Sequence, residues 1–414
     1  MHWLTPVFVV VVIAEMITRL WLSTRQIAAV RAHRDRVPEQ FSGQVELAEQ
    51  QKAADYTVAR SQLGRIDTVA DAIVKLAFTL GGGISFIDSL WSRAGLAQPW
   101  HGALVIGTVL LVLMLLNLPF SLWSTFRVEA RFGFNRQTPA LFVADLLKSL
   151  LLGVILGGPL VIGAILLMEN GGQWWWLYAW VGWTLFSVAL TWAFPRFIAP
   201  LFNKFSPLSD EALKARVENL LERCGFASKG VFVMDGSRRS AHGNAYFTGV
   251  GRNKRIVFFD TLLERLGVAE VEAVLAHELG HFRLKHVRKR LILSLAVSFM
   301  AFAFIAWFAR QPELFAALGV ERPSSHAALL LLMMAAPAFT YFLTPIGAWW
   351  SRKHEFEADD FAARYTDASA LADALVKLYR SNASTLTPDR IHSAFYDSHP
   401  PALVRIARLN ALAR

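Results

Sequence analysis

Seven long apolar stretches dominate this sequence and restrict what it can fold into. A helix needs about 20 apolar residues to cross the hydrocarbon core of a bilayer. The stretches cover residues 3–22, 69–91, 102–123, 146–168, 174–194, 291–308 and 327–350. With 54% hydrophobic residues, the chain is also too apolar for an ordinary soluble enzyme. The sequence therefore predicts a mainly α-helical, polytopic membrane protein with seven transmembrane helices.

Three of these stretches need separate interpretation. The first has no basic region before it and no convincing small-residue cleavage site, so we expect a retained anchor and not a cleaved signal peptide. Charged residues and three glycines at residues 81–83 interrupt the second stretch. In the last stretch, Pro337 and Pro345 would bend the helix.

Loops rich in lysine and arginine alternate with loops that contain few of them. This pattern predicts the orientation of the chain in the membrane. Basic residues are frequent after the first, third, fifth and seventh stretches and sparse after the others. This places the N-terminus outside and the C-terminus in the cytosol. Since the net charge of +10 belongs to residues clustered beside apolar stretches, we expect the bilayer with its anionic headgroups as a partner, and no nucleic acid.

The sequence HELGH at residues 277–281 predicts a zinc hydrolase site on a helix. Residues four positions apart point the same way on a helix, so the imidazoles of His277 and His281 can reach one metal ion. Glu278 would lie beside them and take a proton from metal-bound water. Residues 268–276 contain no Gly or Pro, which favours a helix. The alternative is that two histidines simply share a polar helix face.

A second cluster at residues 354–359, with the sequence HEFEAD, offers the carboxylate that such a site still lacks. Zinc in hydrolases usually takes three protein ligands and leaves one position for water. Glu355 and Asp359 share one helix face, so one can bind the metal while the other accepts a hydrogen bond from a ligand histidine. Spacing alone leaves the choice open, with His354 as a further candidate. Glu357 would point away as a solvated charge.

The predicted topology brings these two halves to the same side of the membrane, because one lies just before the sixth stretch and the other just after the seventh. We therefore divide the chain into four parts. These are transmembrane helices one to five with basic cytoplasmic loops (1–198), a cytoplasmic α+β region ending in the HExxH helix (199–287), transmembrane helices six and seven (288–350), and a C-terminal helical region with the third zinc ligand (351–414).

The α+β region contains three predicted strands, at residues 230–235, 244–249 and 255–260. An edge strand there can bind an extended peptide by backbone pairing. The alternative, that the sheet only supports the motif helix, stays open. Near the end of the chain, His399 precedes two prolines. It is either an ordinary loop residue or a donor to the developing oxyanion of a zinc site.

Together these motifs resemble those of the type-one CAAX prenyl endopeptidases, a family of seven-span zinc metalloproteases of membranes. The matching sequences are HELGH at 277–281, EFEAD at 355–359, SHPP at 398–401, FGFNRQT at 132–138, PLFNKF at 200–205 and NAYF at 244–247. The resemblance covers nearly the whole chain. It implies one Zn²⁺ per chain bound by His277, His281 and Glu355, with Glu278 as the general base and Asp359 supporting a ligand.

The resemblance also implies how a substrate is held. Asn244 would bind the substrate backbone, and His399 would help to stabilise the tetrahedral intermediate. The family fold is a ring of seven helices around a large water-filled chamber, and a wet interior would explain Lys75, Asp88 and Asp145 within apolar segments.

We therefore expect an integral membrane zinc endopeptidase that acts on a peptide or protein substrate, lipidated or otherwise membrane-associated. The general style of the sequence favours a bacterial inner-membrane protein. One alternative is a quality-control metalloprotease of the same clan. A different class is a seven-helix transporter or receptor with a non-catalytic metal site, but the repeated halves typical of transporters are not visible in the sequence.

Overall fold

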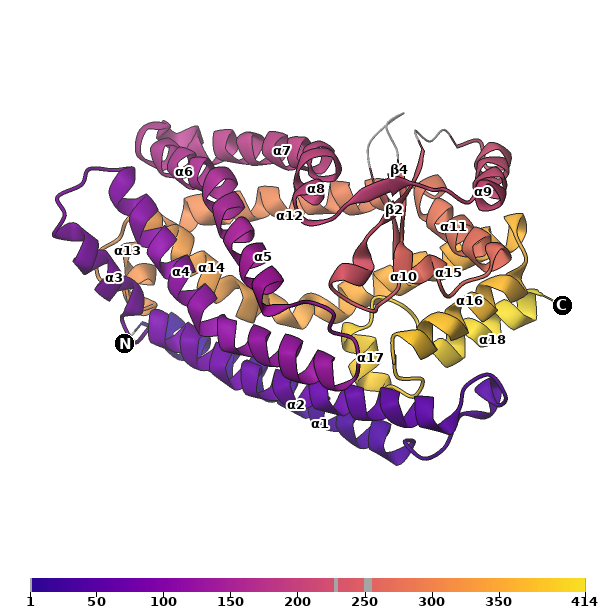
Figure 1. Ribbon diagram of the computed structural model, residues 1–414. Coiled ribbons are helices and arrows are strands. Elements are labelled where there is room, and N and C mark those ends of the chain that lie inside the picture. The colour runs from indigo at the N-terminus through magenta and orange to yellow at the C-terminus, as the bar shows by residue number, and fades with distance from the viewer. Residues whose placement is uncertain (1, 227–229, 249–254, 414) are drawn as a thin grey trace.

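The computed structural model describes residues 2–226, 230–248 and 255–413. It is built mainly of helices and contains one small sheet (Figure 1). The first two helices run along the lower edge of Figure 1, and the sheet and the C-terminal helices gather on its right. The expected mainly α-helical fold with a small α+β unit is confirmed.

Within the described ranges, six helices are long and apolar enough to cross a membrane, and a bent helix pair makes up to seven. The spans are α1 (Leu4–Ala32), α2 (Leu47–Phe78) with α3 (Gly83–Ser92), α4 (Trp100–Trp123), α5 (Pro139–Leu152) with α6 (Gly158–Asn170), α7 (Trp175–Ala193), α12 (His286–Phe308), and α14 (Ser325–Thr340) with α15 (Thr344–Tyr365). Several of these helices continue well beyond the apolar stretches that define them in the sequence.

Two spans are broken at positions that their residues explain. Between α2 and α3 the chain turns by 50°. Gly82 has a φ of +77° there, which a residue without a side chain adopts without strain. In the last span, Pro337 stays inside α14, and the break comes at residues 341–343. Pro345 lies in the first turn of α15, where its missing N–H removes no helical hydrogen bond.

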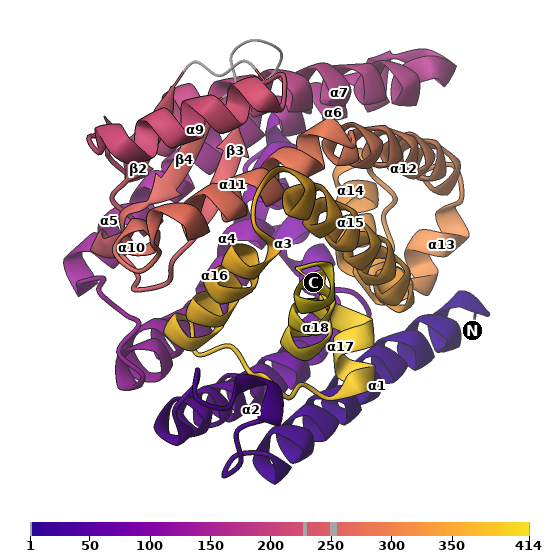
Figure 2. The same cartoon turned by 90° about the vertical axis from the view of Figure 1, so that its right-hand side faces the viewer.

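Charged residues inside the spans are paired with one another. Lys75 on α2 contacts Glu15 on α1 at 2.9 Å and Asp71 at 2.7 Å, and Glu15 also contacts Arg19 at 2.6 Å. Glu15 is 2% exposed and Lys75 is 7% exposed. Helices α1 and α2 lie side by side along the molecule (Figures 1 and 2). The pairing therefore offsets much of the cost of placing these charges at membrane depth.

The sheet has four strands in the order β1-β2-β4-β3. They are β1 (Phe205–Pro207), β2 (Val231–Met234), β3 (Ala245–Thr248) and β4 (Arg255–Phe259). The central pair, β2 and β4, is parallel, while β1 and β3 pair with them antiparallel. Three strands fall where the sequence predicts them, although Gly249 lies outside the described residues. Strand β1 was missed because three residues ending in proline carry no alternating pattern.

Helix α11 (Val268–Arg283) is the centre of the α+β unit. Its buried Leu275 and Leu279 belong to the same core cluster as Ile256 and Phe258 of β4. The helices that complete the fold are α8 (Ala199–Phe202), α9 (Glu211–Arg223), α10 (Asp260–Leu263), α13 (Pro312–Ala317), α16 (Ala368–Ser381), α17 (Arg390–Tyr396) and α18 (Ala402–Leu412). Because α15 continues without a break from the membrane part into this core, it fixes the height of the core relative to the last span.

The buried ion pair between α1 and α2 gives a stability prediction. Replacing Lys75 by Met leaves the buried Glu15 with only Arg19, and we expect a loss of about 3 kcal/mol. Thermal unfolding of the purified protein in detergent measures the change. Substituting Glu15→Gln in the same chain should recover part of the loss, whereas Arg31→Met at the exposed end of α1 serves as the control. An unchanged unfolding temperature in Lys75→Met would contradict the assignment.

Candidate metal centre

Helices α11 and α15 lie side by side and supply the residues of the site (Figure 2). Gly280 permits this approach, since a Cβ at that position would lie 3.0 Å from the Cα of Ala358. His277 and His281 follow one another on the face of α11 that looks toward α15. On α15, Glu355 and Asp359 are both buried beneath the two imidazoles. The structure therefore brings together both motifs that the sequence places 74 positions apart.

Three side chains are arranged as ligands of one ion. The Nε2 atoms of His277 and His281 are 3.2 Å apart. Each lies 3.4 Å from an oxygen of Glu355. Two ligands of a tetrahedral ion with bonds near 2.0 Å are separated by about 3.3 Å. The three spacings therefore match a metal ion bound at their centre.

The hydrogen bonds behind the histidines decide which ring nitrogen is free. His277 donates from Nδ1 to Oδ1 of Asp359 at 2.8 Å, because a carboxylate can only accept. This leaves the Nε2 lone pair of His277 facing Glu355. Asp359 is itself held by Arg405 of α18, which is 5% exposed and donates two hydrogen bonds of 2.7 Å to it.

A second chain of contacts determines which ring nitrogen of His281 is free. Glu357 accepts a hydrogen bond from Nε2 of His286 at 2.9 Å. In a neutral His286, Nδ1 is then an acceptor, and it lies 3.0 Å from Nδ1 of His281. His281 therefore donates from Nδ1 and keeps its Nε2 lone pair for a metal. His354 stacks on His286 with 4.0 Å between the ring centroids, so it supports this chain from the side.

The structure changes the interpretation of one residue of this cluster and adds two residues to it. Glu357 was expected to be a solvated charge, which is wrong, because its carboxylate pairs with the buried His286. Arg405 and His286 were both missed by the sequence analysis. The available signals were Arg405 in the mostly apolar sequence ALVRIARL, which also contains Arg408, and a histidine five positions after His281. Neither signal identifies the residue that Arg405 or His286 contacts, because each contact joins two separate helices.

Unsatisfied lone pairs face one another at the centre of the site. Glu355 is 3% exposed, and its Oε2 accepts no hydrogen bond from any residue in the described ranges. The two imidazole lone pairs point at the same carboxylate. A guanidinium nitrogen of Arg405 lies 3.3 Å from Nε2 of His277 and 3.7 Å from Oε2 of Glu355, and it offsets only part of the cost of burying these three acceptors together. The donor set of two imidazoles and one carboxylate therefore fits a resident metal ion.

Glu278, the remaining acid of the motif, lies on α11 next to the ligands. Burial raises the pKa of its carboxyl group above the ordinary range, and the neighbouring imidazoles act in the opposite direction. A carboxylate with a raised pKa takes up a proton more readily near neutral pH. Its position and basicity are those of a group that exchanges protons beside a metal.

His399 and Asn244 occupy different positions around the centre. His399 lies at the exposed edge of the site, with Nε2 3.5 Å from Oε2 of Glu355. Asn244 immediately precedes the edge strand β3, and its backbone carbonyl accepts a hydrogen bond from Phe259 at 3.0 Å. Its side chain accepts from the N–H of Ala245. The hydrogen bonds described for Asn244 do not reach the metal ligands.

The fold and the site together define a membrane-spanning metallopeptidase. Comparison with known proteins agrees. Residues 26–204 match the family described as "CAAX prenyl protease N-terminal, five membrane helices", and residues 207–413 match peptidase family M48. The chain belongs to peptidase family M48 and is a metalloendopeptidase.

Similar proteins align along most of the chain. A CAAX prenyl protease 1 homolog of Arabidopsis thaliana is 32% identical and covers 96% of this chain and 95% of its own length. The homolog of Homo sapiens is 34% identical over 72% of this chain and 71% of its own. A crystal structure of S. mikatae Ste24p superimposes with a TM-score of 0.89 at 28% identity, covering 99% of both chains. These relatives are eukaryotic, and they lend no support to the expected bacterial source.

Metal retention distinguishes the roles of the two carboxylates on α15. Glu355→Gln removes a direct ligand and should abolish stoichiometric metal binding. Asp359→Asn removes only the acceptor behind His277, and we expect a loss of about 10–100-fold in affinity. Elemental analysis after dialysis against graded chelator measures both variants. Asp360→Asn on the same helix, which pairs with Arg408 at 2.8 Å, is the matched control. Metal kept by Glu355→Gln and lost by Asp359→Asn would reverse the assignment.

Proposed function

We propose that this protein is a zinc endopeptidase of the membrane, with the ion held by His277, His281 and Glu355. The observation that carries the proposal is the convergence of two imidazole lone pairs on a buried carboxylate whose Oε2 has no hydrogen-bond donor among the described residues. Two histidines, one carboxylate and an open fourth side form the donor set that zinc takes in hydrolases. The ion would supply a water molecule of lowered pKa and polarise the peptide carbonyl.

The residues around the ligands support the remaining steps of peptide hydrolysis. Glu278 accepts the proton of the attacking water and delivers it to the leaving amine. Asp359 and Arg405 hold His277 in its metal-binding tautomer. His399, at the exposed edge, donates a hydrogen bond to the oxyanion as the carbonyl carbon becomes tetrahedral. A substrate strand that pairs with β3 would start beside Asn244 and place its backbone along the sheet edge.

The substrate is a peptide C-terminal segment presented from the bilayer. The relatives of the chain are CAAX prenyl proteases by name, and the metal centre continues directly from two membrane spans through α12 and α15. A lipid attached near the scissile bond would remain within the apolar part of the molecule while the peptide reaches the ligands. We therefore infer that prenylated or otherwise lipidated C-termini are cleaved in preference to free peptides.

Substituting Glu278 by Gln tests the chemistry. The amide keeps the shape of the side chain but cannot accept a proton from water, so cleavage should fall by about 100- to 10,000-fold while the metal stays bound. The assay compares a farnesylated CAAX peptide with the same peptide lacking the lipid, for wild type and variant. Turnover of either peptide near the wild-type rate in Glu278→Gln would exclude Glu278 as the base.

We further propose that the metal centre and the C-terminus face the cytosol, while the N-terminus faces outward, on the basis of the loop charges. In a Cys224→Ala background, single cysteines at Gln173 and Glu321 should react with an impermeant thiol reagent added outside. A cysteine at Ala413 should react only after the membrane is opened. All three positions are exposed. Labelling at Ala413 alone in sealed cells would invert the orientation.

A further inference from the structure

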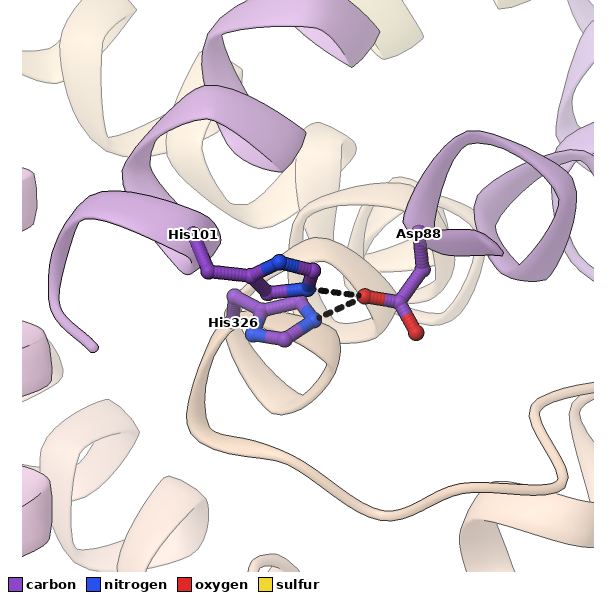
Figure 3. Close-up of side chains that lie close together, drawn as sticks. All are labelled: Asp88, His101 and His326. Carbon is purple, nitrogen blue, oxygen red and sulfur yellow. Dashed lines mark hydrogen bonds and ion pairs between the residues drawn. The ribbon is translucent and has the colours of Figure 1, made fainter. Parts of the chain in front are cut away.

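A second group of metal-binding side chains lies far from the metal centre. Asp88 on α3, His101 on α4 and His326 on α14 place one ligand atom each within 4.8 Å of one another. Figure 3 shows both imidazole rings directed at the same carboxylate oxygen. Helix α3 is at the left end of the molecule in Figure 1, whereas the sheet and α11 are on the right. The three residues therefore belong to a separate site.

Both histidines of this cluster contact the same oxygen atom of Asp88, so the contacts join three helices. Nε2 of His101 lies 2.7 Å from Oδ1 of Asp88, and Nε2 of His326 lies 2.9 Å from the same oxygen. The second carboxylate oxygen points away from the rings in Figure 3. A small rotation of the carboxylate would let it bind an ion through both oxygens. Two imidazoles and one carboxylate are a donor set for borderline divalent ions such as zinc and cobalt.

The charge balance favours a cation at this position. No lysine or arginine nitrogen in the described part of the chain lies within 4.0 Å of Asp88, so only the two imidazoles face its negative charge. His326 is 3% exposed, and Asp88 and His101 are half-buried at the ends of membrane spans. A carboxylate in such surroundings is poorly solvated unless a positive charge accompanies it.

The surroundings hold one ring of the cluster in place. The side-chain amide nitrogen of Gln98 lies 3.4 Å from Nδ1 of His326, and the amide oxygen of Gln98 accepts a hydrogen bond from the backbone N–H of Gly102 at 3.2 Å. Gly102 makes room for the ring, since a Cβ there would lie 3.0 Å from Nδ1. Gln98 and Gly102 therefore fix the orientation of the His326 ring.

A pocket lies next to the cluster without including its three residues. Ser324 lies 3.0 Å from Nε2 of His326, and it also lines a pocket of about 520 Å³. Glu169 lines the same pocket and contacts Ser325 at 2.5 Å, which adds a second negative charge in this pocket. This end of the molecule carries the start of α4 and α14, so it lies on the opposite side of the membrane from the metal centre.

We propose that Asp88, His101 and His326 form a second binding site for a divalent transition-metal ion, which ties α3 to α4 and α14. The nitrogen–oxygen distances of 2.7 and 2.9 Å are shorter than the ~3.3 Å between ligands of a tetrahedral ion. The ion must push the rings and the carboxylate apart, so this site binds more weakly than the metal centre. Its role is structural, because α3 follows the 50° bend of its span and packs mainly against α4, so an ion would add a connection to α14.

Cobalt binding tests this site without reference to catalysis. The full-length chain in detergent, with His277→Ala and His281→Ala to remove the metal centre, is titrated with Co²⁺ and followed by its visible absorption. We expect one equivalent of Co²⁺ and a higher unfolding temperature in its presence. Adding Asp88→Asn, which keeps an oxygen that accepts hydrogen bonds but removes the charge, should weaken binding by more than ~10-fold.

Asp67→Asn is the matched control, because Asp67 is an exposed carboxylate of the same bent span and should leave Co²⁺ binding unchanged. His101→Gln gives a second variant should Asp88→Asn fold poorly. The wild-type chain offers the same comparison, with two equivalents expected against one in Asp88→Asn. If no stoichiometric Co²⁺ binds, or if it stays bound in Asp88→Asn, the three residues are only a hydrogen-bonded group and the proposal is overturned.

Discussion

The close packing of α11 against α15 is the contact on which the rest of the molecule depends. Gly280 and Ala358 let the two helix backbones approach, and this approach places Glu355 within 3.4 Å of both imidazoles. A larger residue at Gly280 would separate the helices and move the carboxylate away from the histidines. The three candidate ligands are therefore positioned by backbone contact and by buried helices, and not by a flexible loop.

Helices α11 and α15 also connect the membrane spans to the candidate metal centre. α12 follows α11 after a short turn, and α15 continues from the last span into the core of the α+β unit. Because these helices join the spans directly to this core, the spans fix how far the candidate metal centre lies from them along the chain. The pairing of Lys75 with Glu15 on α1 and α2 stabilises the helical part on the other side of the fold. A peptide anchored in the membrane would meet a site at a fixed distance from its anchor.

Local sequence patterns predicted the spans and the motif helix and indicated His277 and His281 as candidate ligands, because hydrophobic length and helical spacing are local properties. They left open the choice between Glu355 and Asp359 until a family resemblance was considered. Arg405 and His286 could not be found in this way, since each acts through a contact between distant helices. Glu357 was misjudged for the same reason. The bend at residues 81–83 was signalled by glycines, but its angle depends on packing.

The coordination of the ion tests the central claim most directly. X-ray absorption at the metal edge, on protein purified with one equivalent of zinc, reports the atoms bound to it. Coordination by His277, His281 and Glu355 predicts two imidazoles and carboxylate or water oxygens at about 2.0–2.2 Å, with no sulfur. A spectrum with a single imidazole, or with a sulfur ligand, would show that α11 and α15 do not hold the ion together and would contradict the account.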